Sequence, residues 1–176
     1  FQQYVPNFQA GDDVVYKQMG NPGSGTGVEA LLDIQYIMGI APGTSRPPAP
    51  PCRLRTIFLA RPWRPTACIK TEFWAWQNYD FCSDLISWTS LIIDTADVPN
   101  VFSISYGWQG ALSQLGCTTN EINTIDQNFA TITARGISII FASGDTGSAY
   151  DGSQLWPSWP ASSPFVTAVG STMFTS

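Results

Sequence analysis

The chain has 176 residues, 44% of them hydrophobic and 12% charged, with a formal net charge of −5 and an isoelectric point near 4.4. This length supports one substantial core rather than two full domains, and the acidic, charge-poor composition argues against nucleic acid or a membrane surface as the partner. No apolar run reaches the roughly 18 residues of a membrane span. A chain with few charges loses few ion pairs in acid, so the composition suits an acidic compartment.

The chain has four cysteines, no C-x-x-C pair and no histidine. A zinc site is therefore not expected. The wide spacing of Cys52, Cys68, Cys82 and Cys117 leaves two alternatives open, namely disulfides in an exported protein or buried thiols.

Helical and strand-like patterns alternate along the chain. Apolar residues recur at three- and four-residue steps in the helical segments, whereas the strands are short apolar runs bounded by turn residues. The predicted helices cover residues 28–38, 81–96 and 119–135, and the predicted buried strands cover 101–105, 137–143 and 165–171. This alternation predicts an α/β fold with a parallel sheet and with its functional loops at the carboxyl ends of the strands.

Residues 44–69 differ from the rest of the chain, because they are rich in proline and hold every arginine except Arg135. Our preferred hypothesis is a non-native insertion, since residues 41–43 joined directly to residues 70–76 would make a natural helix-to-strand connection. The alternative is a solvent-exposed basic loop that binds a partner.

Two acidic residues lie four positions apart in the first predicted helix. Glu29 and Asp33 therefore project from one helical face and can share a proton. When two carboxylates approach closely, one pKa rises and the other falls, which produces a general base that works in acid without histidine. Taken alone, this spacing is most often a chance pair on an exposed helix.

Asp145 follows the predicted strand 137–143 in the sequence SGDTG. A carboxyl group at the carboxyl end of a parallel strand lies where ligands of open sheets bind. In its protonated form it can donate a hydrogen bond to a developing oxyanion. The simpler alternative is an aspartate that organises a turn or caps the next helix.

Together, these segments resemble the catalytic domain of the sedolisin family of serine-carboxyl peptidases, with the tripeptidyl-peptidases as the nearest members. The motifs GVEALLDIQY, SISYG, RGISIIFASGDTG and WPASSPFVTAVGST match the family's landmarks in chain order, and only residues 44–69 interrupt the likeness. The resemblance implies a partial subtilisin-like domain, with a parallel sheet flanked by helices. We interpret residues 1–176 as an internal fragment of that domain.

The resemblance also implies roles for the acidic residues. Glu29 corresponds to the general base, Asp33 to the aspartate that shares its proton, and Asp145 to the aspartate of the oxyanion hole. The family's nucleophilic serine lies in a later G-T-S-x-S-x-P motif, which the chain lacks; Ser45 stands in the wrong context for it. The fragment alone is therefore expected to be inactive. Thr146, where serine is commoner, and Ser171, in place of the second glycine of V-G-G-T, are departures from the family pattern.

Further expectations come from the resemblance alone. It implies peptide or protein substrates, removal of tripeptides or endopeptidase action, a propeptide in the precursor, and a lysosomal or secreted location. The fragment is expected to bind no cofactor, whereas calcium is implied for the full-length enzyme.

Two rival interpretations remain. One is a peptidase homologue that binds peptides without cleaving them. The other is a pepsin-like aspartic peptidase, because Asp145-Thr146-Gly147 is also its signature, although helices precede this strand and no second D-T-G or D-S-G occurs.

Overall fold

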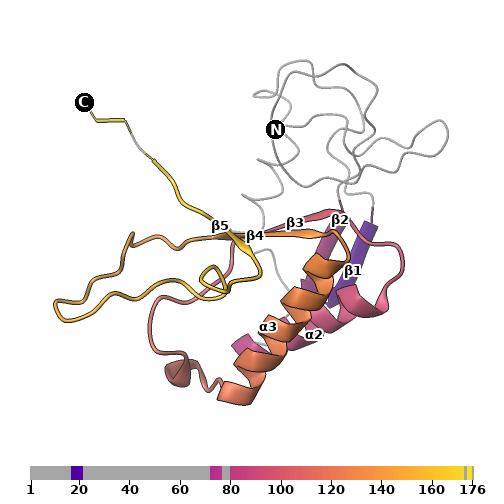
Figure 1. Ribbon diagram of the computed structural model, residues 1–176, viewed down its shortest axis with the longest axis horizontal. Coiled ribbons are helices and arrows are strands. Elements are labelled where there is room, and N and C mark those ends of the chain that lie inside the picture. The colour runs from indigo at the N-terminus through magenta and orange to yellow at the C-terminus, as the bar shows by residue number, and fades with distance from the viewer. Residues whose placement is uncertain (1–16, 22–71, 77–79, 173, 176) are drawn as a thin grey trace.

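A computed structural model describes residues 17–21, 72–76, 80–172, 174 and 175 of the chain. Its elements form two sheets, each made of parallel strands, and a pair of α-helices (Figure 1). In chain order they are β1 (Lys17–Asn21), β2 (Glu72–Trp76), α2 (Phe81–Asp94), β3 (Val101–Ile104), the 3₁₀ helix η1 (Leu112–Leu115), α3 (Thr119–Ala134), β4 (Ser138–Ala142) and β5 (Thr167–Val169).

The larger sheet has the order β3-β4-β5, with both strand pairs parallel. Phe102 pairs with Ile139, and Phe141 pairs with Ala168. The parallel strands β3 and β4 are joined by α3, as expected for a crossover connection. The smaller sheet pairs β1 with β2, also in parallel. The prediction of an α/β fold with a parallel sheet is confirmed.

Helix α2 begins where Asp80 accepts a hydrogen bond from the backbone N–H of Ser83 at 3.1 Å. A side-chain acceptor at this position satisfies one of the unpaired N–H groups of the first turn. The buried face of the helix carries residues three and four positions apart, which is the spacing of one helical stripe. These residues are Cys82, Asp84, Leu85, Trp88, Thr89 and Ile92.

Helix α3 begins with a capping box. The backbone N–H of Glu121 donates to the Thr118 hydroxyl at 3.2 Å, and the backbone N–H of Thr118 donates to the Glu121 carboxylate at 2.7 Å. The helix ends before Gly136, whose φ of 81° lies in the left-handed region that glycine adopts without strain. The predicted helices 81–96 and 119–135 are thus confirmed, each one or two residues shorter at its end.

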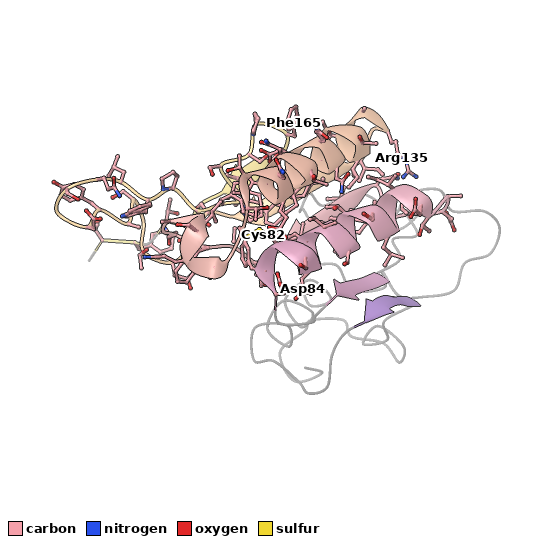
Figure 2. All side chains as sticks on the ribbon, turned by 90° about the horizontal axis from the view of Figure 1, so that it is seen from below. Cys82, Asp84, Arg135 and Phe165 are labelled. Carbon is pink, nitrogen blue, oxygen red and sulfur yellow. A yellow bond between two sulfur atoms is a disulfide. The ribbon has the colours of Figure 1, made fainter. Side chains whose placement is uncertain are left out.

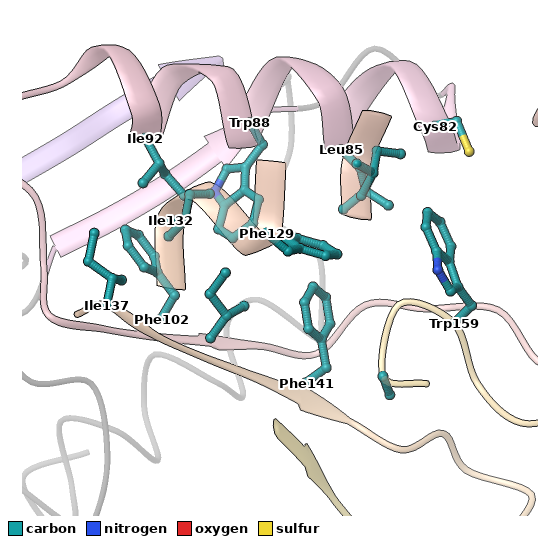
Figure 3. Packing of buried hydrophobic residues seen from close by; sticks show 13 residues of the cluster. Cys82, Leu85, Trp88, Ile92, Phe102, Phe129, Ile132, Ile137, Phe141 and Trp159 are labelled. Atoms are coloured by element: carbon teal, nitrogen blue, oxygen red, sulfur yellow. The ribbon is translucent and has the colours of Figure 1, made fainter. Parts of the chain in front are cut away.

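The core lies between the two helices and one face of the β3-β4-β5 sheet (Figure 3). Phe129 of α3 packs edge-on against Phe141 of β4, with ring centroids 5.7 Å apart, and Trp88 of α2 packs edge-on against Phe102 of β3 at 5.5 Å. Trp159, from the loop before β5, joins the same cluster. The sequence motifs far apart in the chain therefore share one core.

Two predicted strands are less buried than expected. In β4 only Ile139 and Phe141 are buried, because α2 and α3 cover one face of the sheet. All three residues of β5 are exposed, with Val169 at 51%. Among the described residues, β5 is the outer strand and no element lies beyond it.

A disulfide joins Cys82 in α2 to Cys117 just before α3, with the two Cα atoms 5.7 Å apart. For these two cysteines the alternative of buried thiols is thus excluded. Cys52 and Cys68 lie outside the described residues, as do the predicted helix 28–38 and the segment 44–69. In the part of the chain that the structure describes, no helix is long and apolar enough to cross a bilayer.

Candidate active site

An open cleft of about 320 Å³ lies at the carboxyl ends of β3 and β4. This is the edge of the sheet where ligands of parallel α/β folds bind. Three segments line it: the residues that follow β3, the last residue of β4 with the turn after it, and one serine from the long loop before β5. The lining residues are Ser105, Tyr106, Gly107, Gln109, Ala142, Gly144, Asp145 and Ser158.

Asp145 is exposed to solvent in this cleft. Among the described residues, its carboxylate has no hydrogen-bond partner, so it neither caps a helix nor closes a turn there. The carboxyl oxygens are consequently available to a ligand. This arrangement favours a chemical role for Asp145 over the alternative of a turn-organising residue.

The loop that carries Asp145 is held by the side chain of Gln109, from the segment after β3. The Gln109 carboxamide oxygen accepts hydrogen bonds from the Thr146 hydroxyl at 2.7 Å and from the Thr146 backbone N–H at 3.3 Å. Its NH₂ group donates to the carbonyl oxygens of Gly147 at 3.0 Å and Trp156 at 3.5 Å. One uncharged side chain therefore joins three parts of the site.

Gly107 and its neighbours connect the cleft to the loop before β5. Trp108 and Trp159 exchange two backbone hydrogen bonds of 2.8 and 3.0 Å. A Cβ atom at Gly107 would lie 2.7 Å from the Ser158 hydroxyl oxygen, so only glycine allows this close approach. The wall of the cleft is thus fixed by backbone contacts.

Tyr106 supplies an aromatic surface to the cleft and is 43% exposed. Its ring stacks on Phe81, with centroids 4.9 Å apart. Burial of part of the side chain raises the pKa of the Tyr106 phenol, and the nearby carboxylates of Asp84 and Asp80 raise it further. The hydroxyl therefore remains protonated and able to donate a hydrogen bond.

The structure describes one of the three predicted site residues. Asp145 lies at the predicted strand end, whereas Glu29 and Asp33 lie outside the described residues. The sequence does not mark Gln109 or Ser158, because a single glutamine or serine in a loop has no spacing pattern that distinguishes it. Tyr106 and Gly107 belong to the SISYG motif, which signals the end of β3 but not the shape of the cleft.

The chain was compared with known proteins by sequence and by structure. No protein-family profile matches the chain. The chain is 31% identical over 166 residues to tripeptidyl-peptidase 1 from Mus musculus and 30% identical to the same protein from Rattus norvegicus, with 91% of this chain aligned. These alignments cover 24% of each relative, so the chain spans about a quarter of the length of the curated relatives it matches.

A solved structure of Pseudomonas sedolisin, a serine-carboxyl proteinase complexed with two molecules of pseudo-iodotyrostatin, matches the fold with a TM-score of 0.60. The two sequences are 24% identical, and the match covers 92% of this chain and 42% of that one. The chain is therefore similar to tripeptidyl-peptidase 1 in sequence and to sedolisin in fold. Its sheet and paired helices are a partial sedolisin-type α/β domain, as the sequence motifs predict.

The described residues of this chain contain no group of three or more histidine, cysteine or carboxylate side chains placed to hold a metal ion. Calcium binding by the full-length protein stays a prediction from the sequence.

Proposed function

We propose that the intact protein containing this chain is a serine-carboxyl peptidase that hydrolyses peptide bonds in acid, and that this chain supplies the acidic part of its active site. One observation carries the proposal. Asp145 presents a carboxyl group without a partner among the described residues, in an open cleft at the carboxyl ends of two parallel strands.

In the proposed mechanism, four residues have separate chemical roles. A serine from outside these 176 residues attacks the peptide carbonyl, and Glu29 accepts its proton as general base while Asp33 shares that proton. The roles of Glu29 and Asp33 rest on the motif GVEALLDIQY alone. Asp145, in its protonated form, donates a hydrogen bond to the oxyanion of the tetrahedral intermediate.

Substrate and setting are proposed from the same resemblance. The enzyme would remove tripeptides from free N-termini, with endopeptidase action as the alternative within the family. A propeptide in the precursor and a lysosomal or secreted location agree with this activity. The exposed Tyr106 ring, in the same cleft as Asp145, offers an apolar surface to a substrate side chain.

The test is mutagenesis of the intact protein, assayed on a peptide with a free N-terminus in acid. Asp145→Ala should lower kcat by about 10²–10³-fold, which corresponds to about 2.7–4 kcal/mol of transition-state stabilisation. Glu29→Ala should abolish nearly all turnover. Asp94→Ala removes an exposed carboxylate from the last position of α2, outside the cleft, and should leave kcat unchanged.

Each rival function has its own outcome in this assay. Peptide binding without cleavage by the intact wild-type protein would support a non-catalytic homologue. Inhibition by pepstatin would support an aspartic peptidase, although the parallel α/β setting of Asp145 favours the sedolisin chemistry. Unchanged turnover in Asp145→Ala or in Glu29→Ala would overturn the proposed role of that residue.

A further inference from the structure

Gln109 satisfies the hydrogen-bonding groups of the loop on the C-terminal side of Asp145. Its carboxamide makes four hydrogen bonds, two accepted from Thr146 and two donated to the carbonyl oxygens of Gly147 and Trp156. A primary amide has two N–H donors and an oxygen with two lone pairs, so this side chain uses all of its capacity. Such full use fixes both its rotamer and its amide orientation.

Gln109 also packs against the N-terminal side of Asp145. A Cβ atom on Gly144 would overlap the Gln109 carboxamide oxygen. Gly144 has a φ of 93°, which side chains other than glycine rarely adopt. Asp145 therefore stands between Gly144, which packs under the carboxamide, and Thr146, which is bound to it.

We propose that Gln109 is a positioning residue for Asp145, a role that rests on the proposed function of the cleft. Among the described residues, the Asp145 carboxylate itself has no partner, so the direction of its side chain depends on the backbone on either side. An oxyanion donor must lie 2.7–3.1 Å from the developing charge, and small displacements at such sites reduce turnover strongly. Gln109 sets that backbone from both sides.

The chemical nature of the side chain fits this role. An amide does not titrate, so its four hydrogen bonds persist in acid, whereas a carboxylate in the same place would gain a proton and change its bonding. It also brings both donors and acceptors, which the loop needs because it presents one N–H, one hydroxyl and two carbonyl groups. Neither glutamate nor leucine, of similar length, could satisfy all four.

The first test measures kcat and KM of Gln109→Ala in the intact protein. We expect kcat to fall on the order of 10- to 100-fold, with KM changed by less than about 3-fold, because the oxyanion contact is made in the transition state. Gln127→Ala, a glutamine exposed on α3, is the matched control and should keep wild-type kinetics. A loss in KM alone would contradict the role of Gln109.

A double-mutant cycle asks whether Gln109 acts through Asp145. If it does, adding Gln109→Ala to Asp145→Ala should change kcat by no more than about 2-fold, since the interaction that it supports is already lost. Additive losses would overturn the inference while leaving the role of Asp145 intact. If Asp145→Ala itself retains full activity, the proposed function fails instead.

Substitution of Thr146 tests the same inference while Gln109 is left unchanged. Thr146→Val removes the hydroxyl that donates at 2.7 Å to the Gln109 carboxamide but keeps the shape of the side chain. Thr146→Ser keeps the hydroxyl. We expect the valine variant to lose kcat and the serine variant to retain it, at equal thermal stability. Equal kcat in both variants would contradict the inference, even if Gln109→Ala fails to fold.

Discussion

Asp145 and Asp151 lie in the same loop region but differ in their surroundings. Asp145 has no hydrogen-bond partner among the described residues, whereas the Asp151 carboxylate accepts four hydrogen bonds. The donors are the Ser153 backbone N–H and hydroxyl, the Gln154 N–H and the Trp156 indole, at 2.7–2.9 Å. One aspartate is thus free to act on a ligand, and the other organises the loop.

The hydrogen bonds to Asp151 hold the pKa of its carboxyl far below the ordinary value of 3.8, with the Ser153 hydroxyl as the largest cause. A depressed folded-state pKa means that the contribution to stability is complete above the unfolded-state pKa and is lost only as the pH falls through the folded-state value. The loop should therefore keep its conformation throughout the acidic range in which we propose that the enzyme works.

Asp151→Asn tests this loop. The amide nitrogen of asparagine cannot accept the Trp156 indole hydrogen bond of 2.7 Å that the Oδ2 atom now accepts. We expect faster hydrogen exchange in residues 150–157 of the variant than in those of the wild type at the same pH, both at about pH 6 and at about pH 4. Asp94→Asn serves as control. Equal exchange in Asp151→Asn and wild type would show that these bonds do not order the loop.

At the scale of elements, α2 and α3 lie side by side against the sheet (Figure 2). The hydroxyl of Thr89 donates to the Leu85 carbonyl at 2.8 Å and accepts from the Asn128 amide of α3 at 2.9 Å. At the C-terminal ends of the two helices, Arg135 donates to the carbonyl oxygens of Ile92, Ile93 and Thr95 at 2.9–3.2 Å. The guanidinium group thereby binds carbonyl oxygens at the C-terminal end of α2, one of which, that of Ile92, also accepts the backbone N–H of Thr95 at 3.4 Å.

Replacement of Arg135 should destabilise the helix pair. A cation at a helix C-terminus interacts favourably with the helix macrodipole and with the last carbonyl oxygens. Because Arg135 is exposed, solvent screens this interaction. We expect Arg135→Ala to lower the free energy of unfolding by about 1 kcal/mol. Arg135→Lys should lose less stability, because lysine keeps the positive charge. It should still lose some, because lysine lacks the planar guanidinium group that donates to several carbonyls at once. Urea unfolding at low and high salt measures both, and no difference between the two variants at low salt would contradict this account.

At the scale of the whole molecule, the disulfide and the loop before β5 connect segments that are distant in the sequence. Cys82 and Cys117 are 35 residues apart, and their bond joins the start of α2 to the residue before the N-cap of α3. Trp108 and Trp159 join the end of β3 to the loop before β5. The cleft therefore depends on contacts across the chain rather than on one local motif.

Removal of the disulfide should destabilise the folded protein. A crosslink that closes a loop of this length restricts the unfolded chain, so Cys82→Ala combined with Cys117→Ala should lower the free energy of unfolding by about 3–4 kcal/mol. On reduction, the wild type should lose more stability than the double variant, by an amount comparable to the effect of the two substitutions. A wild-type protein equally stable with and without reductant would contradict this prediction.

The sequence by itself determined the order α2, β3, α3, β4 and β5 and the position of Asp145, but it did not mark the 3₁₀ helix η1. Apolar periodicity places α2 and α3, and β-branched runs place β3 and β4, because these signals are local and arise from which side chains must leave water. The family motifs mark Asp145 for the same reason, since a strand end and its following turn are adjacent in the chain. Glu29 and Asp33 remain predictions from the sequence.

Only the tertiary structure decided the pairing of Cys82 with Cys117, the exposure of β5 and the hydrogen bonds of Gln109. These depend on which segments meet in space. The hydrogen bonds of Gln109 reach residues 37, 38 and 47 positions away, a separation at which no periodic pattern relates one residue to another. The surroundings of Asp145 are formed because β3 and β4 are parallel neighbours, so that their carboxyl ends lie side by side. This places Gln109, which follows β3, against Gly144, which follows β4.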